Sequence, residues 1–69
     1  MYLTDEDLTG WSFHIQNMLR HKHLLSQWHI DFLENVDEFL YQRRFLSLKQ
    51  IKILDAINEM VNKGEADAL

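Results

Sequence analysis

Residues 11–63 contain neither proline nor glycine, and this uninterrupted stretch is the feature that most constrains the fold. Proline and glycine are the residues that most often end helices and form tight turns, so their absence over such a length favours helices. The only two glycines, Gly10 and Gly64, lie near the two ends of the chain. Helix boundaries must therefore be marked by capping residues.

A repeated capping signal predicts where three helices begin. A leucine is followed by a serine or threonine and, four residues after that hydroxyl residue, by another apolar residue: Leu8-Thr9 with Phe13, Leu25-Ser26 with Ile30, and Leu46-Ser47 with Ile51. This spacing is typical of an N-cap hydroxyl flanked by a hydrophobic staple, and at the third position Gln50 completes a capping box. We therefore predict helices at about 10–22, 27–44 and 48–62.

Apolar residues recur at helical spacing in each predicted helix, which gives each one an apolar face. The three faces comprise Leu8, Trp11, Ile15, Met18 and Leu19; Trp28, Phe32, Leu33, Val36, Phe39 and Leu40; and Ile53, Leu54, Ile57, Met60 and Val61. Short connections make neighbouring helices antiparallel. The sequence thus predicts an all-α fold, a small three-helix bundle that forms a single domain over residues 1–69, with residues 1–8 and 63–69 frayed.

The composition narrows the class of protein. The 69 residues include no cysteine, which excludes a disulfide framework, and a net charge of −4 with 46% hydrophobic residues is typical of a folded domain. No apolar run approaches the about 18 residues of a membrane span, and the acidic start is unlike a signal peptide. We expect a cytoplasmic protein without a membrane partner.

The small predicted core favours association with another chain. Burial of about a dozen large side chains roughly balances the entropy cost of ordering the chain, so we expect a homodimer. Four apolar residues outside the predicted core are candidates for the interface: Tyr2, Tyr41, Leu48 and Ile51. The alternative is that they are scattered surface residues, which are common on monomers.

Basic residues gather where the second predicted helix ends and the third begins. These four residues, Arg43, Arg44, Lys49 and Lys52, could contact phosphate or an acidic protein. Alternatively, the arginines stabilise a helix C-terminus and the lysines are merely solvated. The exposed stripe of the third predicted helix is mostly acidic, unlike a DNA-reading helix.

Neither a metal site nor catalysis is expected. The four histidines lack the spacing of a metal-ligand set, so we predict no metal and no cofactor. There is no glycine-rich phosphate loop and no cysteine nucleophile, and we expect a chain of this size to lack a pocket of about 300 Å³. The sequence therefore predicts a protein that is not an enzyme.

Residues 25–57 resemble a short helix-corner-helix segment of phage and mobile-element proteins. The resemblance rests on Leu25-Ser26-Gln27-Trp28, Phe32-Leu33, Leu40, the run from Arg43 to Gln50, Leu54 and Ile57. His29 replaces an acidic residue of that pattern, and Gln42 replaces a glycine. The resemblance implies a viral or plasmid origin, with the host cytoplasm as the location, and work beside DNA-handling machinery.

Two functional hypotheses follow. The first is a regulatory protein-interaction module, a homodimer that docks on a larger protein of unknown identity through an apolar helix face and modulates it. The second is a nucleic-acid accessory protein that uses the four basic residues as phosphate contacts, against which the overall acidity of the chain weighs.

Overall fold

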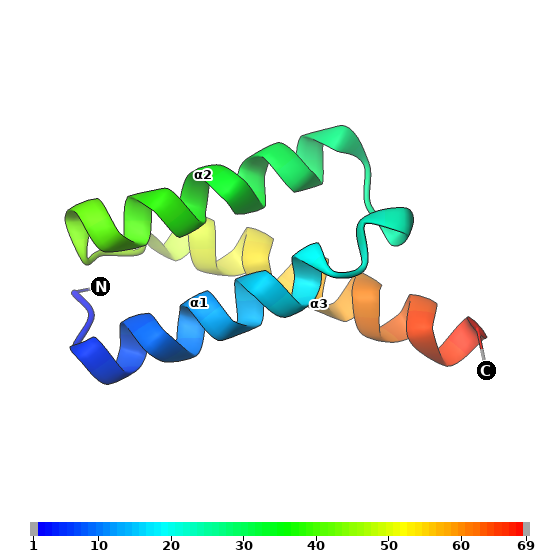
Figure 1. Cartoon of the computed structure of the whole chain (residues 1–69), viewed down its shortest axis with the longest axis horizontal. Helices are drawn as coiled ribbons and strands as arrows, with labels where there is room; N and C mark the ends of the chain where they lie inside the picture. The colour runs from blue at the N-terminus through cyan, green and yellow to red at the C-terminus, as the bar shows by residue number, and fades with distance from the viewer. Residues whose placement is uncertain (1, 69) are drawn as a thin grey trace.

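Three helices form an all-α bundle, which confirms the predicted fold class (Figure 1). The computed structural model describes the backbone of residues 2–68 and the side chains of residues 2–64. The elements are α1 (Asp5–Leu19), a short 3-10 helix η1 (Lys22–Leu24), α2 (Gln27–Arg43) and α3 (Leu48–Ala68). α1 and α2 lie antiparallel, while α3 begins beside the end of α2 and passes behind α1 to the other end of the molecule (Figure 1). No described helix combines the length and the apolar character that a membrane crossing requires.

The start of α1 differs from the prediction. Thr4, not Thr9, is the N-cap: its Oγ1 accepts the N–H of Asp7 at 3.2 Å, and the Asp7 carboxylate accepts the N–H of Thr4 at 3.1 Å. Asp7 completes this capping box, whereas Ser12, three residues after Thr9, is too short to do so. Thr9 instead lies within α1 and donates its hydroxyl to the Asp5 carbonyl.

The segment before α1, which lies within residues 1–8 that were predicted to fray, packs against the rest of the bundle. Leu3 is buried, and its N–H donates to the carbonyl of Arg44 at 2.9 Å. Tyr2 forms an isolated antiparallel bridge with Phe45. Met1 lies outside the described residues. The start of the chain is thereby attached to the connection between α2 and α3.

α2 begins at the predicted N-cap, Ser26, whose Oγ accepts the N–H of His29 at 3.3 Å. The reciprocal bond of this capping box uses a histidine, since the Ser26 N–H donates to His29 Nδ1 at 3.2 Å. α2 ends at Arg43, because Arg44 adopts a left-handed conformation with φ of 52° and donates its N–H to the Leu40 carbonyl. α1 ends earlier than predicted, at Leu19, and η1 lies in the connection between α1 and α2.

α3 begins after the capping box predicted at Ser47 and Gln50, whose two hydrogen bonds measure 2.8 and 3.0 Å. The helix continues to Ala68 and not to residue 62. Gly64 lies inside it, where a Cβ would sit 2.7 Å from Leu24 Cδ1, so this glycine permits close packing on η1 and does not end the helix. α3 therefore extends past its predicted end into the residues predicted to fray, and Leu69 lies outside the described residues.

The core lies between the three helices and contains no buried polar or charged residue in the described part of the chain. It comprises Leu3, Leu8, Ile15, Met18, Leu33, Val36, Leu40, Leu46, Leu54, Ile57 and Val61. Two residues assigned to the core from periodicity are exposed: Trp28 by 60% and Met60 by 36%. Both of these side chains contribute to a groove described below.

Candidate functional site

A groove of about 400 Å³ lies between the beginning of α2 and one flank of α3. We call it the Trp28 groove, and it is lined by Trp28, His29, Lys49, Lys52, Ile53, Ala56, Ile57 and Met60. Four of these residues follow one another along α3 at spacings of three or four, so they form one stripe along the helix: Lys49, Lys52, Ala56 and Met60. The lining thus has an apolar floor, two lysines and no acidic residue.

The Trp28 ring is exposed but held in place. It stacks on Phe32 with 5.5 Å between ring centroids and 8° between ring planes. Phe32 in turn packs against the buried core. A tryptophan that is fixed on one face and open to solvent is suited to anchor a binding partner, since little side-chain entropy remains to be lost.

His29 connects the Trp28 groove to the N-terminal cap of α2. Its ring lies edge-on to Trp28, with centroids 5.5 Å apart, and its Nδ1 lies 2.7 Å from the Ser26 hydroxyl oxygen. The same nitrogen accepts the Ser26 N–H, so the capping box fixes the position of this groove residue.

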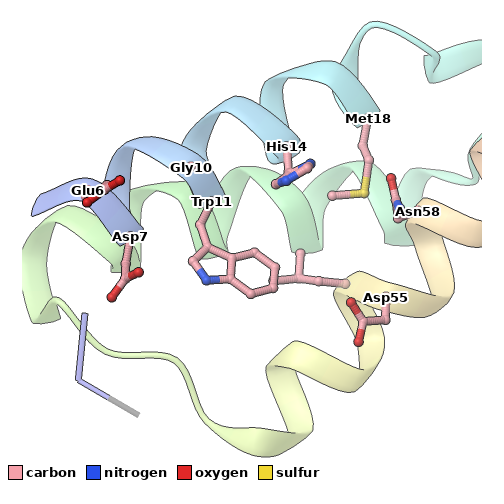
Figure 2. A pocket seen from close by; sticks show the side chains of 9 residues that line it. Glu6, Asp7, Gly10, Trp11, His14, Met18, Asp55 and Asn58 are labelled. Carbon is pink, nitrogen blue, oxygen red and sulfur yellow. The ribbon is translucent and has the colours of Figure 1, made fainter. Parts of the chain in front are cut away.

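A second groove, of about 430 Å³, lies between α1 and the opposite flank of α3 (Figure 2). We call it the Trp11 groove, and it is lined by Glu6, Asp7, Gly10, Trp11, His14, Met18, Leu54, Asp55 and Asn58. Figure 2 shows the Trp11 indole extending between Asp7 and Asp55. This lining contains three carboxylates and no lysine or arginine.

The two grooves correct the expectation that a chain of this size has no space of about 300 Å³. α3 passes behind α1 and does not lie in one layer with both other helices (Figure 1). A groove lies on each of its flanks. The crossing of helices depends on how their side chains fit, which the apolar period of a sequence does not specify.

The four basic residues do not form one surface. Arg44 forms an ion pair with Asp5, and its carbonyl accepts the Leu3 N–H, so this residue holds the start of the chain. Arg43 is exposed at the end of α2. Lys49 and Lys52 line the Trp28 groove instead.

The apolar interface candidates also separate. Tyr2, Tyr41 and Leu48 are 84%, 62% and 70% exposed, and the edge of the Tyr2 ring contacts Phe45. Ile51 packs against the core, so its side chain is already covered. Neither groove includes any of these four residues.

Sequence reasoning missed Trp28 as a surface residue because it lies on the apolar face of α2. A residue in the first turn of a helix lies at the end of the bundle, where fewer neighbours can cover it. The position of Trp28 in the first turn of the predicted helix was therefore the sequence signal that its side chain is exposed. Phe13, which is 70% exposed, was explained by a staple around Thr9 that does not form.

Within the described residues, no group of three or more histidine, cysteine or acidic side chains could hold a metal ion. No protein-family model, curated protein or solved structure matches the chain.

Proposed function

We propose that the chain is a protein-interaction module that binds an acidic amphipathic helix of a larger protein in the Trp28 groove and thereby modulates that protein. The observation that carries this proposal is the 60% exposure of Trp28 at the edge of an apolar groove. Helix-in-groove recognition uses such apolar furrows, with a few buried anchor residues supplying most of the binding free energy.

The lysines determine the chemistry of the partner. Lys49 and Lys52 border an apolar floor, so a partner that places aliphatic residues on the floor and glutamates or aspartates at its edges matches both parts of the surface. Complementary charges at the edge of an interface accelerate association and exclude partners of the wrong sign. The resemblance of residues 25–57 to a phage and mobile-element segment adds, within this proposal, a host-cytoplasmic partner among DNA-handling proteins.

A nucleic-acid function draws less support. An apolar floor contributes nothing to contact with a phosphate backbone, and Arg44 is already paired with Asp5. The net charge of −4 also opposes non-specific attraction to nucleic acid.

The test uses two matched helical peptides. Both carry leucines at positions that form one apolar stripe, and they differ only in having glutamate or lysine at the flanking positions. Binding is measured by fluorescence anisotropy of the labelled peptide. We expect the glutamate peptide to bind. Its affinity is expected to fall about tenfold or more in Trp28→Ala and in the double variant Lys49→Glu/Lys52→Glu.

The matched control is Phe13→Ala, which removes an aromatic side chain of similar exposure from outside both grooves. This control is expected to leave the affinity unchanged. Circular dichroism checks that each variant retains its helices. The proposal is wrong if the glutamate peptide fails to bind or binds the Trp28→Ala variant equally well.

The expected homodimer is tested in parallel by analytical ultracentrifugation, since a second copy of the chain is a competing occupant of the same groove. A partner-binding groove requires the Trp28 surface to be free in the unbound protein. A tight dimer that Trp28→Ala dissociates would assign the groove to self-association and contradict the proposed partner.

A further inference from the structure

We infer that the Trp11 groove is a second docking site, which binds a basic amphipathic segment of a protein. The chain would then hold two segments of opposite charge on opposite flanks of α3. This inference concerns different residues from the proposed function and does not rest on it.

The carboxylates of the Trp11 groove come from two helices, and the lining includes His14 but no lysine or arginine. Glu6 and Asp7 belong to the first turn of α1, and Asp55 belongs to the middle of α3. The side chains of Glu6 and Asp55 form no hydrogen bond or ion pair among the described residues. A cationic group bound in the groove is attracted by carboxylates from both helices, so the surface is complementary to a basic segment.

The floor of the groove explains why the ligand is a lysine or arginine side chain and not a bare ion. Trp11, Met18 and Leu54 supply an apolar surface, and the indole lies between two carboxylates (Figure 2). The aliphatic stem of lysine or arginine packs on such a surface while its charged end reaches the carboxylates. The face of an indole also attracts cations, and the flexible Met18 thioether adapts to different aliphatic neighbours.

Gly10 keeps one wall of this groove open. A Cβ at this position would have no heavy atom within 4 Å, so the missing side chain leaves free space beside Trp11. An approaching segment can therefore contact the backbone of α1 at Gly10. The position also offers a test that leaves every carboxylate unchanged, since a leucine there would fill the groove and favours the helix more than glycine does.

The decisive experiment uses the lysine peptide that is matched to the glutamate peptide described above. We expect the lysine peptide to bind and its affinity to fall as salt is raised. The affinity of the lysine peptide is expected to fall about tenfold or more in two kinds of variant: the charge reversal Glu6→Lys/Asp55→Lys and the steric block Gly10→Leu. Asp7 is left in place because it caps α1.

The matched control is Lys49→Glu/Lys52→Glu, which changes the charge of the other groove by the same amount in the opposite direction. This control is expected not to lower the affinity of the lysine peptide. Binding that is lost on charge reversal but kept by Gly10→Leu would show general attraction to an acidic surface and would overturn the inference. Absence of lysine-peptide binding would overturn it as well.

The crossed design separates the two proposals. Failure of the glutamate peptide alone contradicts the Trp28 groove, and failure of the lysine peptide alone contradicts the Trp11 groove. Each peptide is measured separately, because helical peptides of opposite charge that share a leucine stripe also bind each other.

Discussion

Gly10 and Gly64 both lie inside helices, but their surroundings are opposite. A Cβ at Gly10 would meet nothing within 4 Å, whereas a Cβ at Gly64 would lie 2.7 Å from Leu24 Cδ1. In a helix interior, alanine is more stable than glycine by about 0.5–1 kcal/mol. We predict that Gly10→Ala raises the free energy of unfolding by that amount and that Gly64→Ala gives no such gain, because the Leu24 side chain must move. Urea denaturation of both variants measures the difference.

An equal gain at both positions would contradict this prediction. It would mean that Leu24 relocates without cost and that η1 does not depend on its contact with α3. Gly10→Ala also serves as the folding control for Gly10→Leu in the peptide experiments, since both add a side chain at the same place.

His29 completes the cap of α2 at the position where a capping box usually has glutamate or glutamine. Its Nδ1 accepts the Ser26 N–H, and the Ser26 Oγ accepts the His29 N–H in return. The imidazole therefore stabilises the start of α2 through a local hydrogen bond.

We predict that His29→Ala lowers the free energy of unfolding by about 1 kcal/mol, because the Ser26 N–H loses its capping partner. His29→Gln is expected to retain most of the stability, since glutamine is a standard capping-box residue at this position. Urea denaturation of the two variants measures the difference. Equal losses in both variants would refute the role of His29 in the cap.

At the scale of elements, the start of α1 depends on Thr4 and not on Thr9. The Thr4 hydroxyl accepts the N–H of Asp7, and the Asp7 carboxylate accepts the N–H of Thr4. Thr9 only donates its hydroxyl to a carbonyl within the helix. We predict that Thr4→Ala lowers the free energy of unfolding by about 1 kcal/mol and that Thr9→Ala changes it little. Chemical denaturation of this pair of variants, which remove the same side chain five residues apart, provides the comparison. A larger loss for Thr9→Ala would reverse the assignment of the cap.

The starts of α2 and α3 were predictable because their capping signals are local. Ser26 and Ser47 each have a partner three residues later that closes a capping box, so the sequence within one turn decides the boundary. The start of α1 was ambiguous, since Leu8 follows Thr4 at the staple spacing and also precedes Thr9. Asp7 resolves the ambiguity in favour of Thr4.

The grooves were not predictable in the same way, because each combines side chains from two helices. The sequence identifies Lys49 and Lys52 as members of a cluster of four basic residues. Their proximity to Trp28, however, depends on how α3 packs against α2. Glu6 and Asp55 join in one groove only because α3 crosses α1. Helix crossing is set by side-chain fit over the whole interface, which no local pattern encodes.

At the scale of the whole molecule, the bundle is closed where the start of the chain meets the connection between α2 and α3. The Leu3 N–H donates to the Arg44 carbonyl, and the Arg44 guanidinium pairs with Asp5. The two side chains of that ion pair are 52% and 89% exposed, so the pair contributes little to stability. Burial of the Leu3 side chain in the core is the larger contribution.

Leu3 and Tyr2 therefore provide the clearest test of how the bundle is closed. Leu3 is 5% exposed and Tyr2 is 84% exposed, although they are adjacent in the chain. Leu3→Ala leaves a cavity in the core and is predicted to lower the free energy of unfolding by about 2–4 kcal/mol. Tyr2→Ala removes only the edge contact with Phe45 and is predicted to cost less than about 1 kcal/mol. Equal small losses in urea denaturation would mean that the segment before α1 does not complete the core and that α1 to α3 are sufficient without it.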